Sequence, residues 1–409
     1  MEPVLVEWVA LLIRWLHLIA GMAWIGASFY FMHIDASLKP VSDIPAGKGG
    51  EAWEVHGGGF YQVRKYLIAP DHLPRELLWH KWQSYTTWIS GFLLLVWVYY
   101  LGASLYLIDP AVWPTTPGIA AAVGIGSLVA GWVLYDLLCR SPLGRSDLWL
   151  AVAGFAIVVA AAYLYGRVFG GRAAMLHTGA LMATWMSGNV AMLIIPNQRK
   201  VVASLLAGEA PDPALGKAAK QRSSHNNYLT LPVVFLMLSG HYPLVYASGY
   251  GWVTVALVLV AGGVIRHFYN ERHAGRGDPW WTWLVAAVCI LMMIWLSQTA
   301  TPDGRAALGL APKEPAPSLI AQSAAPAEIA DVVISRCSMC HGASPSWEGI
   351  GIAPKGVLLD TPEHVARQAD AIRVFAVMTK AMPPHNITEM TQEERQTLQT
   401  WLDRTADAP

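Results

Sequence analysis

One uncharged stretch decides the fold: Trp280-Trp281-Thr282-Trp283-Leu284-Val285-Ala286-Ala287-Val288-Cys289-Ile290-Leu291-Met292-Met293-Ile294-Trp295-Leu296-Ser297-Gln298. A helix of about 20 apolar residues is long enough to cross the hydrocarbon core of a bilayer. The rest of the chain has the same character, because 54% of its 409 residues are hydrophobic and only 14% are charged. This composition excludes an ordinary soluble domain and predicts that most of the chain lies in lipid.

Similar apolar stretches precede this one along the chain. The length rule gives eight candidate spans, at roughly 5–33, 84–108, 117–138, 148–168, 174–196, 226–247, 251–268 and 280–298. The first is too long for a removable signal peptide and lacks a small-residue cleavage pattern. We therefore predict an all-α fold, with an eight-span transmembrane helical bundle in residues 1–298.

Lysine and arginine residues are distributed unevenly between these spans. They gather in the connections 34–83, 139–147, 197–225 and 269–279, whereas the alternate connections hold only Arg167 and Arg172. Because cytoplasmic loops carry the excess of positive charge, the first set is predicted to be cytoplasmic and both termini periplasmic. Over the whole chain, 28 Lys+Arg balance 28 Asp+Glu, which gives no indication of a nucleic-acid partner.

The C-terminal part contains Cys337-Ser338-Met339-Cys340-His341, the pattern Cys-x-x-Cys-His. It is the attachment signal of c-type haem, in which Cys337 and Cys340 form the thioether bonds and His341 binds the iron. The alternatives are a chance pairing or a zinc half-site, but no second thiol pair follows. Since c-type haem is attached on the outer face of the bacterial inner membrane, the motif agrees with the predicted topology.

Residues 327–406 are predicted to form a small helical unit around this haem, similar to a class I cytochrome c domain. The Pro- and Ala-rich segment 299–326 is predicted to be an extended tether. Helices are expected from about Ala327, from Thr361-Pro362 with proline at the first helical position, and from the capping box of Thr391 and Glu394.

The haem iron needs a second axial ligand from the opposite side. Met382 is the predicted ligand, because a thioether before two prolines sits on a stiff loop that presents it in one direction. Met378 and Met390 are the alternatives, as is a role for Met382 in the core.

Histidine residues occur at both ends of the predicted spans, and ionisable side chains at membrane depth mark functional sites by default. The outer set is His17, His177 and His241, of which two are candidates for the iron ligands of a b-type haem. The cytoplasmic set, suited to proton transfer, metal ligation or an anionic substrate, is His33, His80, His225 and His267. The alternative for each is a hydrogen bond between helices.

The predicted cytoplasmic connection 34–83 is much longer than a turn. It contains His56-Gly57-Gly58-Gly59-Phe60-Tyr61-Gln62-Val63-Arg64-Lys65-Tyr66, in which the alternation after Gly59 predicts a short strand or hairpin arm. The glycines permit unusual dihedral angles or close approach to a ligand. The alternative is a flexible loop with a basic edge.

Four segments together resemble the bacterial membrane-bound urate oxidases. They are residues 15–26 (WLHLIAGMAWIG), residues 56–61 (HGGGFY), residues 79–88 (WHKWQSYTTW) and the Cys-x-x-Cys-His motif. The resemblance covers nearly the whole chain and implies an integral-membrane domain in 1–298 followed by a cytochrome c domain. It also implies oxidation of urate to 5-hydroxyisourate in purine breakdown, with electrons leaving through the haem and not reducing oxygen to peroxide.

Urate at neutral pH is a planar monoanion, so its site is expected to offer a cation, amide donors and aromatic surface. Arg64, Gln62, Phe60 and Tyr61 offer these groups, and the predicted general base is His80 or His225. Electrons are then expected to pass one at a time through a membrane haem to the haem c, and on to cytochrome c or a terminal oxidase.

Two other functions are compatible with the same residues. One is a different membrane dehydrogenase that feeds electrons to quinone or cytochrome c. The other is a transporter or assembly scaffold with a tethered cytochrome. The sequence leaves open the number of haems and the oligomeric state.

Overall fold

The computed structural model describes residues 3–44, 49–66, 74, 76–109, 112–246, 249–299, 308–309, 324–348, 350, 353–354 and 357–404. Most of these residues are helical, as the sequence predicts. The predicted tether 299–326 lies outside the described residues except for 299, 308–309 and 324–326.

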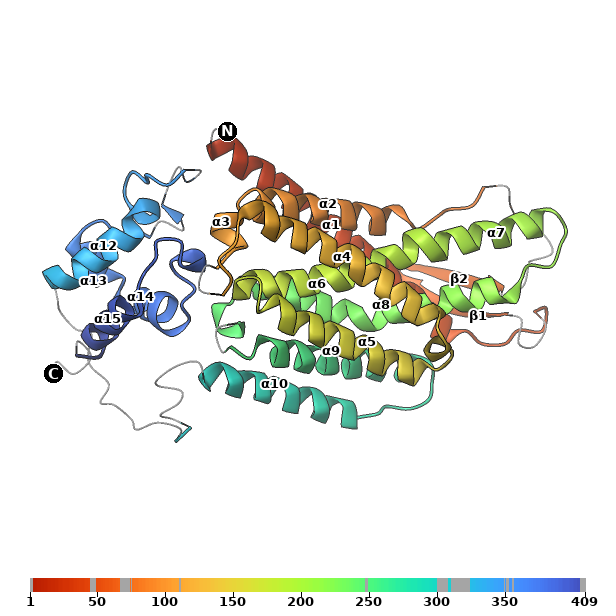
Figure 1. Cartoon of the computed structure of the whole chain (residues 1–409). Coiled ribbons are helices and arrows are strands. Elements are labelled where there is room, and N and C mark those ends of the chain that lie inside the picture. The colour runs from red at the N-terminus through yellow and green to blue at the C-terminus, as the bar shows by residue number, and fades with distance from the viewer. Residues whose placement is uncertain are drawn as a thin grey trace.

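The N-terminal part is a bundle of long helices that run back and forth side by side (Figure 1). Its elements are α1 (Pro3–Ser37), α2 (Trp82–Leu94) continued by the π-helical turn η1 (Leu95–Tyr100), α3 (Ala103–Tyr106), α4 (Pro117–Arg140), η2 (Pro142–Arg145), α5 (Asp147–Tyr165), α6 (Gly171–Gly188) continued by η3 (Asn189–Ile194) and α7 (Ile195–Leu206), α8 (Pro213–Ser239), η4 (Pro243–Val245), α9 (Gly251–His273) and α10 (Trp281–Thr299).

Six of the predicted spans are confirmed as helices long and apolar enough to cross a membrane: Leu5–Ser37, Pro117–Arg140, Asp147–Tyr165, Gly171–Leu206, Gly251–His273 and Trp281–Thr299. The spans predicted at 84–108 and 226–247 are not among them. They coincide with α2–η1 and with the second half of α8, which lie in the same bundle. These helices are more polar because part of their surface faces other helices, as the buried Ser84, Arg222 and Asn227 show.

The outer surface of the bundle is apolar. Exposed large hydrophobic side chains occur all along the helices α1, α4, α5 and α10, for example Trp15, Leu137, Leu148 and Leu291. In water such a surface would be a large unfavourable patch, whereas in a bilayer it faces lipid tails. The fold is therefore that of a multi-pass membrane protein.

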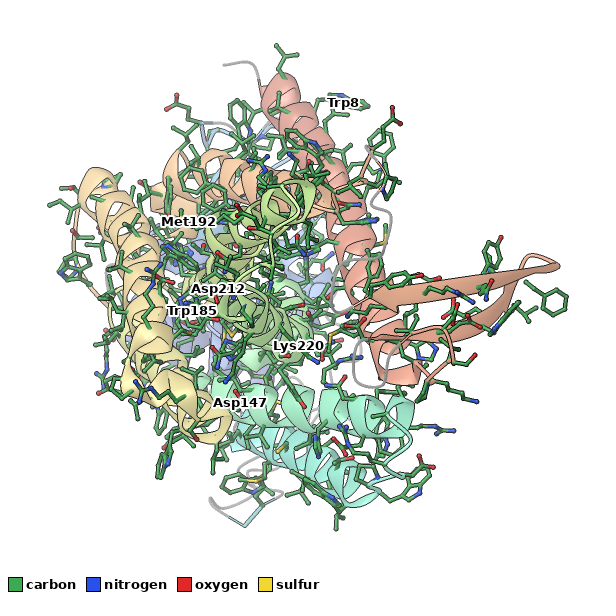
Figure 2. All side chains as sticks on the ribbon, turned by 90° about the vertical axis from the view of Figure 1, so that its right-hand side faces the viewer. Trp8, Asp147, Trp185, Met192, Asp212 and Lys220 are labelled. Carbon is green, nitrogen blue, oxygen red and sulfur yellow. The ribbon has the colours of Figure 1, made fainter. Side chains whose placement is uncertain are left out.

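A β-hairpin leaves one end of the bundle, and the prediction of a hairpin arm is confirmed. Strand β1 (Gly49–His56) pairs antiparallel with β2 (Gly59–Tyr66), from Gly49 opposite Tyr66 to His56 opposite Gly59. Gly57 and Gly58 form the two-residue turn with φ values of +59° and +79°, which glycine adopts without strain. Viewed from this end, the hairpin projects away from the helices (Figure 2). We call this end of the bundle the hairpin end.

The C-terminal residues form a separate small helical unit with its own apolar core. Its elements are α12 (Ala327–His341), α13 (Pro362–Arg367), α14 (Ala369–Ile372), η6 (Arg373–Met378), η7 (Pro384–Asn386) and α15 (Gln392–Arg404). The predicted helix starts are confirmed: the Thr361 hydroxyl accepts from the His364 amide, and Thr391 and Glu394 exchange the two hydrogen bonds of a capping box.

This C-terminal unit lies against the end of the bundle opposite the hairpin (Figure 1). We call this opposite end the docking end. His385 of η7 inserts its ring between α3 and the start of α6, where it donates to the Tyr106 carbonyl and faces Gly170 so closely that a Cβ atom there would overlap the ring. Arg172 lies close enough to influence its charge. The packing of His385 against Gly170 is thus a contact between the C-terminal unit and the bundle.

The contact predicts the effect of adding one methyl group. Gly170→Ala is expected to weaken docking of the C-terminal unit by about 1–3 kcal/mol, because overpacking forces the His385 ring out. The distance between spin labels on the bundle and on the unit should broaden in this variant. Gly154→Ala, where a Cβ would meet nothing, is the matched control and should leave the distance unchanged. Adding His385→Ala to Gly170→Ala should relieve the overlap. If the single variant Gly170→Ala docks like the native protein, the contact is contradicted.

Docking should also depend on pH. Burial lowers the pKa of His385 from 6.5 to about 4, with the Tyr106 carbonyl opposing this effect and the Arg172 charge adding to it. A lowered pKa in the docked state means that docking favours the neutral ring. The contact is therefore expected to be strongest above pH 6.5 and to weaken as the pH falls from there toward 4. In the same spin-label experiment His385→Gln should lose this pH dependence; an unchanged pH dependence in that variant would assign it to another group.

Candidate functional site

The predicted substrate residues of the hairpin are brought together around a carboxylate. Gln62 Nε2 lies 2.7 Å and Arg64 Nε 2.8 Å from Oε2 of Glu51 on the paired strand, and Arg64 Nη1 also lies 2.5 Å from Asp43 Oδ2. Partial burial opposes ionisation of Glu51, but the donors Gln62 and Trp53 and the Arg64 charge outweigh it and lower its pKa. The Arg64 charge is thus already matched by two carboxylates.

The two predicted aromatic residues are exposed to solvent. Phe60 is 78% exposed and Tyr61 51% exposed. The hairpin is tied to α1 instead by Lys65, which pairs with Asp35 at 2.5 Å, and by Glu54, which accepts from Tyr30 at 2.8 Å. The four predicted residues therefore share a hairpin but do not enclose a common pocket among the described residues.

The two predicted bases lie in different surroundings. His80 is exposed at the start of α2, with its ring 5.0 Å from that of Phe31 and its Nδ1 3.5 Å from the Gln83 amide. His225 is half-buried on α8, and its Nδ1 lies 2.7 Å from the hydroxyl of Tyr135 on α4. Of the two, His225 is the one that the fold holds in a single orientation.

His225 belongs to a buried polar network, which we call the Arg222 network: Tyr135, Asp136, Asn189, Arg222, His225 and Asn226. Arg222 is 2% exposed and donates to Asp136 at 2.7 Å and to Asn189 at 2.9 Å. Asn189 in turn donates to the Tyr135 hydroxyl and to Asn226, both at 2.9 Å. The Tyr135 hydroxyl thus contacts both Asn189 and His225.

The other members of this network were missed by sequence reasoning. A signal was present, because Arg222, His225 and Asn226 recur at the i, i+3, i+4 spacing that places side chains on one helix face. Their partners on α4 and η3 lie far away in the sequence. Arg222 has a carboxylate partner in Asp136, which also pairs with the exposed Arg140 at 2.7 Å.

A second buried polar group lies on another side of α8, toward α1 and α9. It consists of Phe29, His33, Asn227, Arg266, Asn270 and His273, and we call it the Arg266 cluster. Arg266 is 6% exposed and Asn227 is fully buried. Consecutive asparagines of α8, Asn226 and Asn227, thus serve two different centres at the hairpin end.

The predicted membrane-haem ligands lie toward the docking end. His177 is fully buried; its Nδ1 donates to the Ala173 carbonyl at 2.9 Å and its Nε2 lies 3.2 Å from the Tyr100 hydroxyl. His17 bonds through Nδ1 to the Thr87 carbonyl and Ser90 hydroxyl, and His241 is exposed. Both nitrogens of His177 therefore have protein partners, and Nε2 would have to exchange the Tyr100 hydroxyl for an iron to act as a ligand. The membrane haem stays a prediction.

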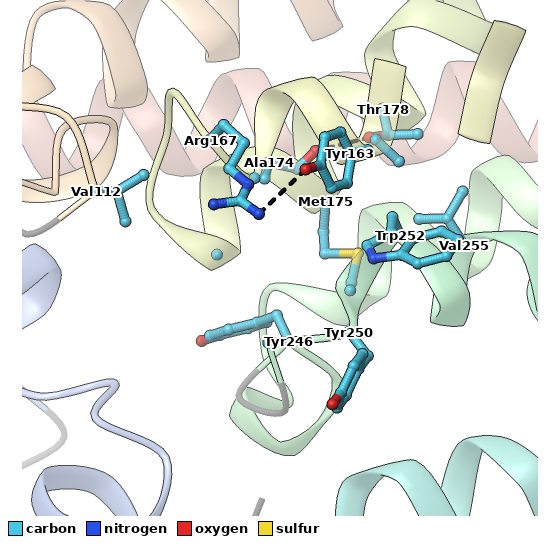
Figure 3. A pocket seen from close by; sticks show the side chains of 15 residues that line it. Val112, Tyr163, Arg167, Ala174, Met175, Thr178, Tyr246, Tyr250, Trp252 and Val255 are labelled. Carbon is cyan, nitrogen blue, oxygen red and sulfur yellow. Dashed lines mark hydrogen bonds between the residues drawn. The ribbon is translucent and has the colours of Figure 1, made fainter. Parts of the chain in front are cut away.

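A pocket of about 510 Å³ opens at the docking end between α5, α6 and α9 (Figure 3). Arg167 and Tyr163 stand at one side, joined by a hydrogen bond of 3.1 Å, and Tyr246 and Tyr250 at the other. Met175 reaches into the space between them. None of the predicted substrate or catalytic residues lines this pocket.

The Cys-x-x-Cys-His residues fit a covalently attached haem. Cys337 and Cys340 are unpaired thiols on α12. His341 donates from Nδ1 to the Val357 carbonyl at 3.0 Å, the kind of bond that fixes a ligating imidazole with Nε2 toward the iron. Burial raises the pKa of Cys337 to about 12, which disfavours a reactive thiolate.

The predicted second ligand and its alternatives differ in position. The Met382 backbone is fixed on both sides, since its N–H donates to the Phe375 carbonyl at 2.8 Å and its own carbonyl accepts from Arg395 at 3.1 Å. Met390, one of the alternatives, is 3% exposed in the core. Met382 as ligand stays a prediction. Across the described parts of the chain, no group of three or more His, Cys, Asp or Glu residues is placed to hold a metal ion.

Comparison with known proteins gives one match. Residues 3–297 match the family described as urate oxidase N-terminal, which spans the whole helical bundle and the hairpin. No curated protein and no solved structure matches the chain. Because the match covers well over half of its length, the chain belongs to the urate oxidase N-terminal family.

Proposed function

We propose that this protein is a membrane-bound urate oxidase that converts urate to 5-hydroxyisourate and passes the electrons to a c-type haem in residues 327–406. The family match over residues 3–297 carries the proposal. The Cys-x-x-Cys-His motif and the bond that orients His341 support the haem.

The proposed arrangement has eight spans, with the hairpin end in the cytoplasm and the docking end in the periplasm. It is supported by α2–η1 and α8, which lie among the six apolar helices, and by the Lys- and Arg-rich connections at the hairpin end. Both ends of the chain then lie on the periplasmic side, as covalent haem attachment in bacteria requires.

Oxidation of urate to 5-hydroxyisourate adds the oxygen of one water molecule and releases two electrons and two protons. The protein therefore has to accept protons where urate reacts. His225 is the proposed base, because its imidazole is held in place by the Tyr135 hydroxyl, 2.7 Å from Nδ1. Arg222 and Asn189 hold Tyr135 in place by its ring and its hydroxyl. The exposed His80 is the second candidate.

The two electrons have to leave at the other end of the bundle. A haem bound to Cys337 and Cys340 takes up electrons one at a time. His341 would hold its iron on one side and Met382 on the other, and His385 would keep the unit against the docking end. Cytochrome c or a terminal oxidase is the proposed acceptor beyond it.

The first test is the electron balance. Membranes that contain the protein are expected to consume urate and to reduce added cytochrome c without hydrogen peroxide. Cys337→Ala with Cys340→Ala should abolish cytochrome c reduction, because the haem is no longer attached, whereas Cys289→Ala on α10 is the control thiol and should retain it. Hydrogen peroxide formed in proportion to the urate consumed would contradict the proposal. Urate uptake without oxidation in the double variant would favour a transporter.

The second test separates the two candidate bases. His225→Ala is expected to lower kcat for urate by about 10²- to 10⁴-fold, the usual contribution of a positioned general base. Tyr135→Phe should show part of this loss, since it removes the hydroxyl that contacts Nδ1. Stopped-flow measurement of haem reduction gives the rates. If His80→Ala shows the loss and His225→Ala does not, the base is His80.

A further inference from the structure

We infer that the Arg266 cluster binds the planar purine anion, with Arg266 as its counter-ion. This inference rests on the proposed function and names the place of the substrate. The cluster lies at the hairpin end, between α1, α8 and α9, next to the Arg222 network.

The charge of Arg266 has no carboxylate partner among the described residues. Its Nε donates to Asn227 Oδ1 at 3.3 Å and its Nη2 to Asn270 Oδ1 at 3.2 Å, both neutral amides. By contrast, Arg222 pairs with Asp136, and Arg64 pairs with Asp43 and Glu51. A buried guanidinium without an anion is costly, so a bound anion would satisfy it.

The amide of Asn227 offers a second group to a ligand. Its Oδ1 accepts from both Arg266 and Asn270, which fixes the orientation of the amide. The Nδ2 donor then points elsewhere, and it is buried without a hydrogen-bond partner among the described residues. Buried donors in native proteins are nearly always paired, so this one indicates a ligand acceptor such as a purine carbonyl.

His33 provides the second unpaired atom. His33 Nδ1 is also buried without a partner in the described part of the chain, while Nε2, on the other side of the ring, lies 4.0 Å from Glu54 of the hairpin. The rings of His33 and His273 are 4.3 Å apart. His33 is one helical turn from Phe29. The Phe29 ring lies 3.9 Å from the guanidinium carbon of Arg266 and orients the guanidinium plane.

This combination suits a flat organic anion better than a simple inorganic one. Urate has negative charge spread over a planar ring with carbonyl and N–H edges, which match a guanidinium fork, an amide donor and an imidazole nitrogen. The proposed base His225 lies on the same helix, two residues from Asn227 and on another side of α8. The predicted hairpin residue Arg64, already paired twice, is less available for this role.

The test compares three substitutions in the intact membrane protein. Arg266→Gln should raise KM for urate about tenfold or more, as expected for loss of a charge-assisted hydrogen bond, and Arg266→Lys should recover only part of the affinity because the fork is lost. Asn227→Asp is the sharpest variant. It places a carboxylate where Arg266 already donates, so the protein should stay folded while urate binding is lost. Arg276→Gln, an exposed arginine paired with Glu271, is the matched control and should leave KM unchanged.

Binding is measured directly by equilibrium dialysis of urate, and KM by urate-dependent reduction of cytochrome c. An unchanged KM in both Arg266→Gln and Asn227→Asp overturns the inference while leaving the enzyme proposal intact. If KM for urate rises only in Arg64→Gln, the urate site is assigned to the hairpin instead. If urate binds to the native protein and not to Arg266→Gln, but is never oxidised, the result supports the anion site and contradicts the proposed enzyme activity. Competition by inorganic phosphate as strong as by urate would overturn the purine assignment.

Discussion

Polar groups carried into the bundle have to find partners inside the protein, because lipid offers none. Helix α8 shows this constraint most clearly. Arg222 is 2% exposed and reaches Asp136 of α4, while Asn189 joins the same network from η3. These bonds fix the neighbours of α8 and leave the lipid-facing surface to apolar side chains. The position of α4, η3 and α8 at the hairpin end follows from this one ion pair and its amide partners.

The two centres beside α8 differ in charge, and this difference suggests a division of roles. The Arg222 network contains a carboxylate, Asp136, and is hydrogen-bonded throughout, so it can hold a base such as His225 in one orientation. The Arg266 cluster has an arginine without a carboxylate partner, and polar atoms of Asn227 and His33 have no hydrogen-bond partner among the described residues. A rigid, satisfied centre next to an incomplete one is what a reaction on a bound anion requires.

The opposite end of the molecule serves a different purpose. There the C-terminal unit is held by the insertion of His385 beside Gly170, a small contact compared with the interior of either part. A contact of this size, sensitive to protonation, suits a carrier that must meet another protein. In the proposed function the anion site and the electron carrier lie at opposite ends of the bundle, so urate and the acceptor would not compete for one surface.

Local patterns in the sequence were enough to predict six of the spans, the Gly57-Gly58 hairpin, and the helix caps at Thr361 and Thr391, because each depends on neighbours in the chain. The partners of those residues could not be predicted this way. The sequence around Arg64 suggests an anion site, but in the folded chain its charge is paired with Asp43 and Glu51. Arg266 lies in an apolar stretch that gives no such signal, and among the described residues it has no carboxylate partner. Charge balance between distant helices is a property of three-dimensional packing, so only the tertiary structure shows which buried arginine lacks an acidic partner and is available for the proposed anion.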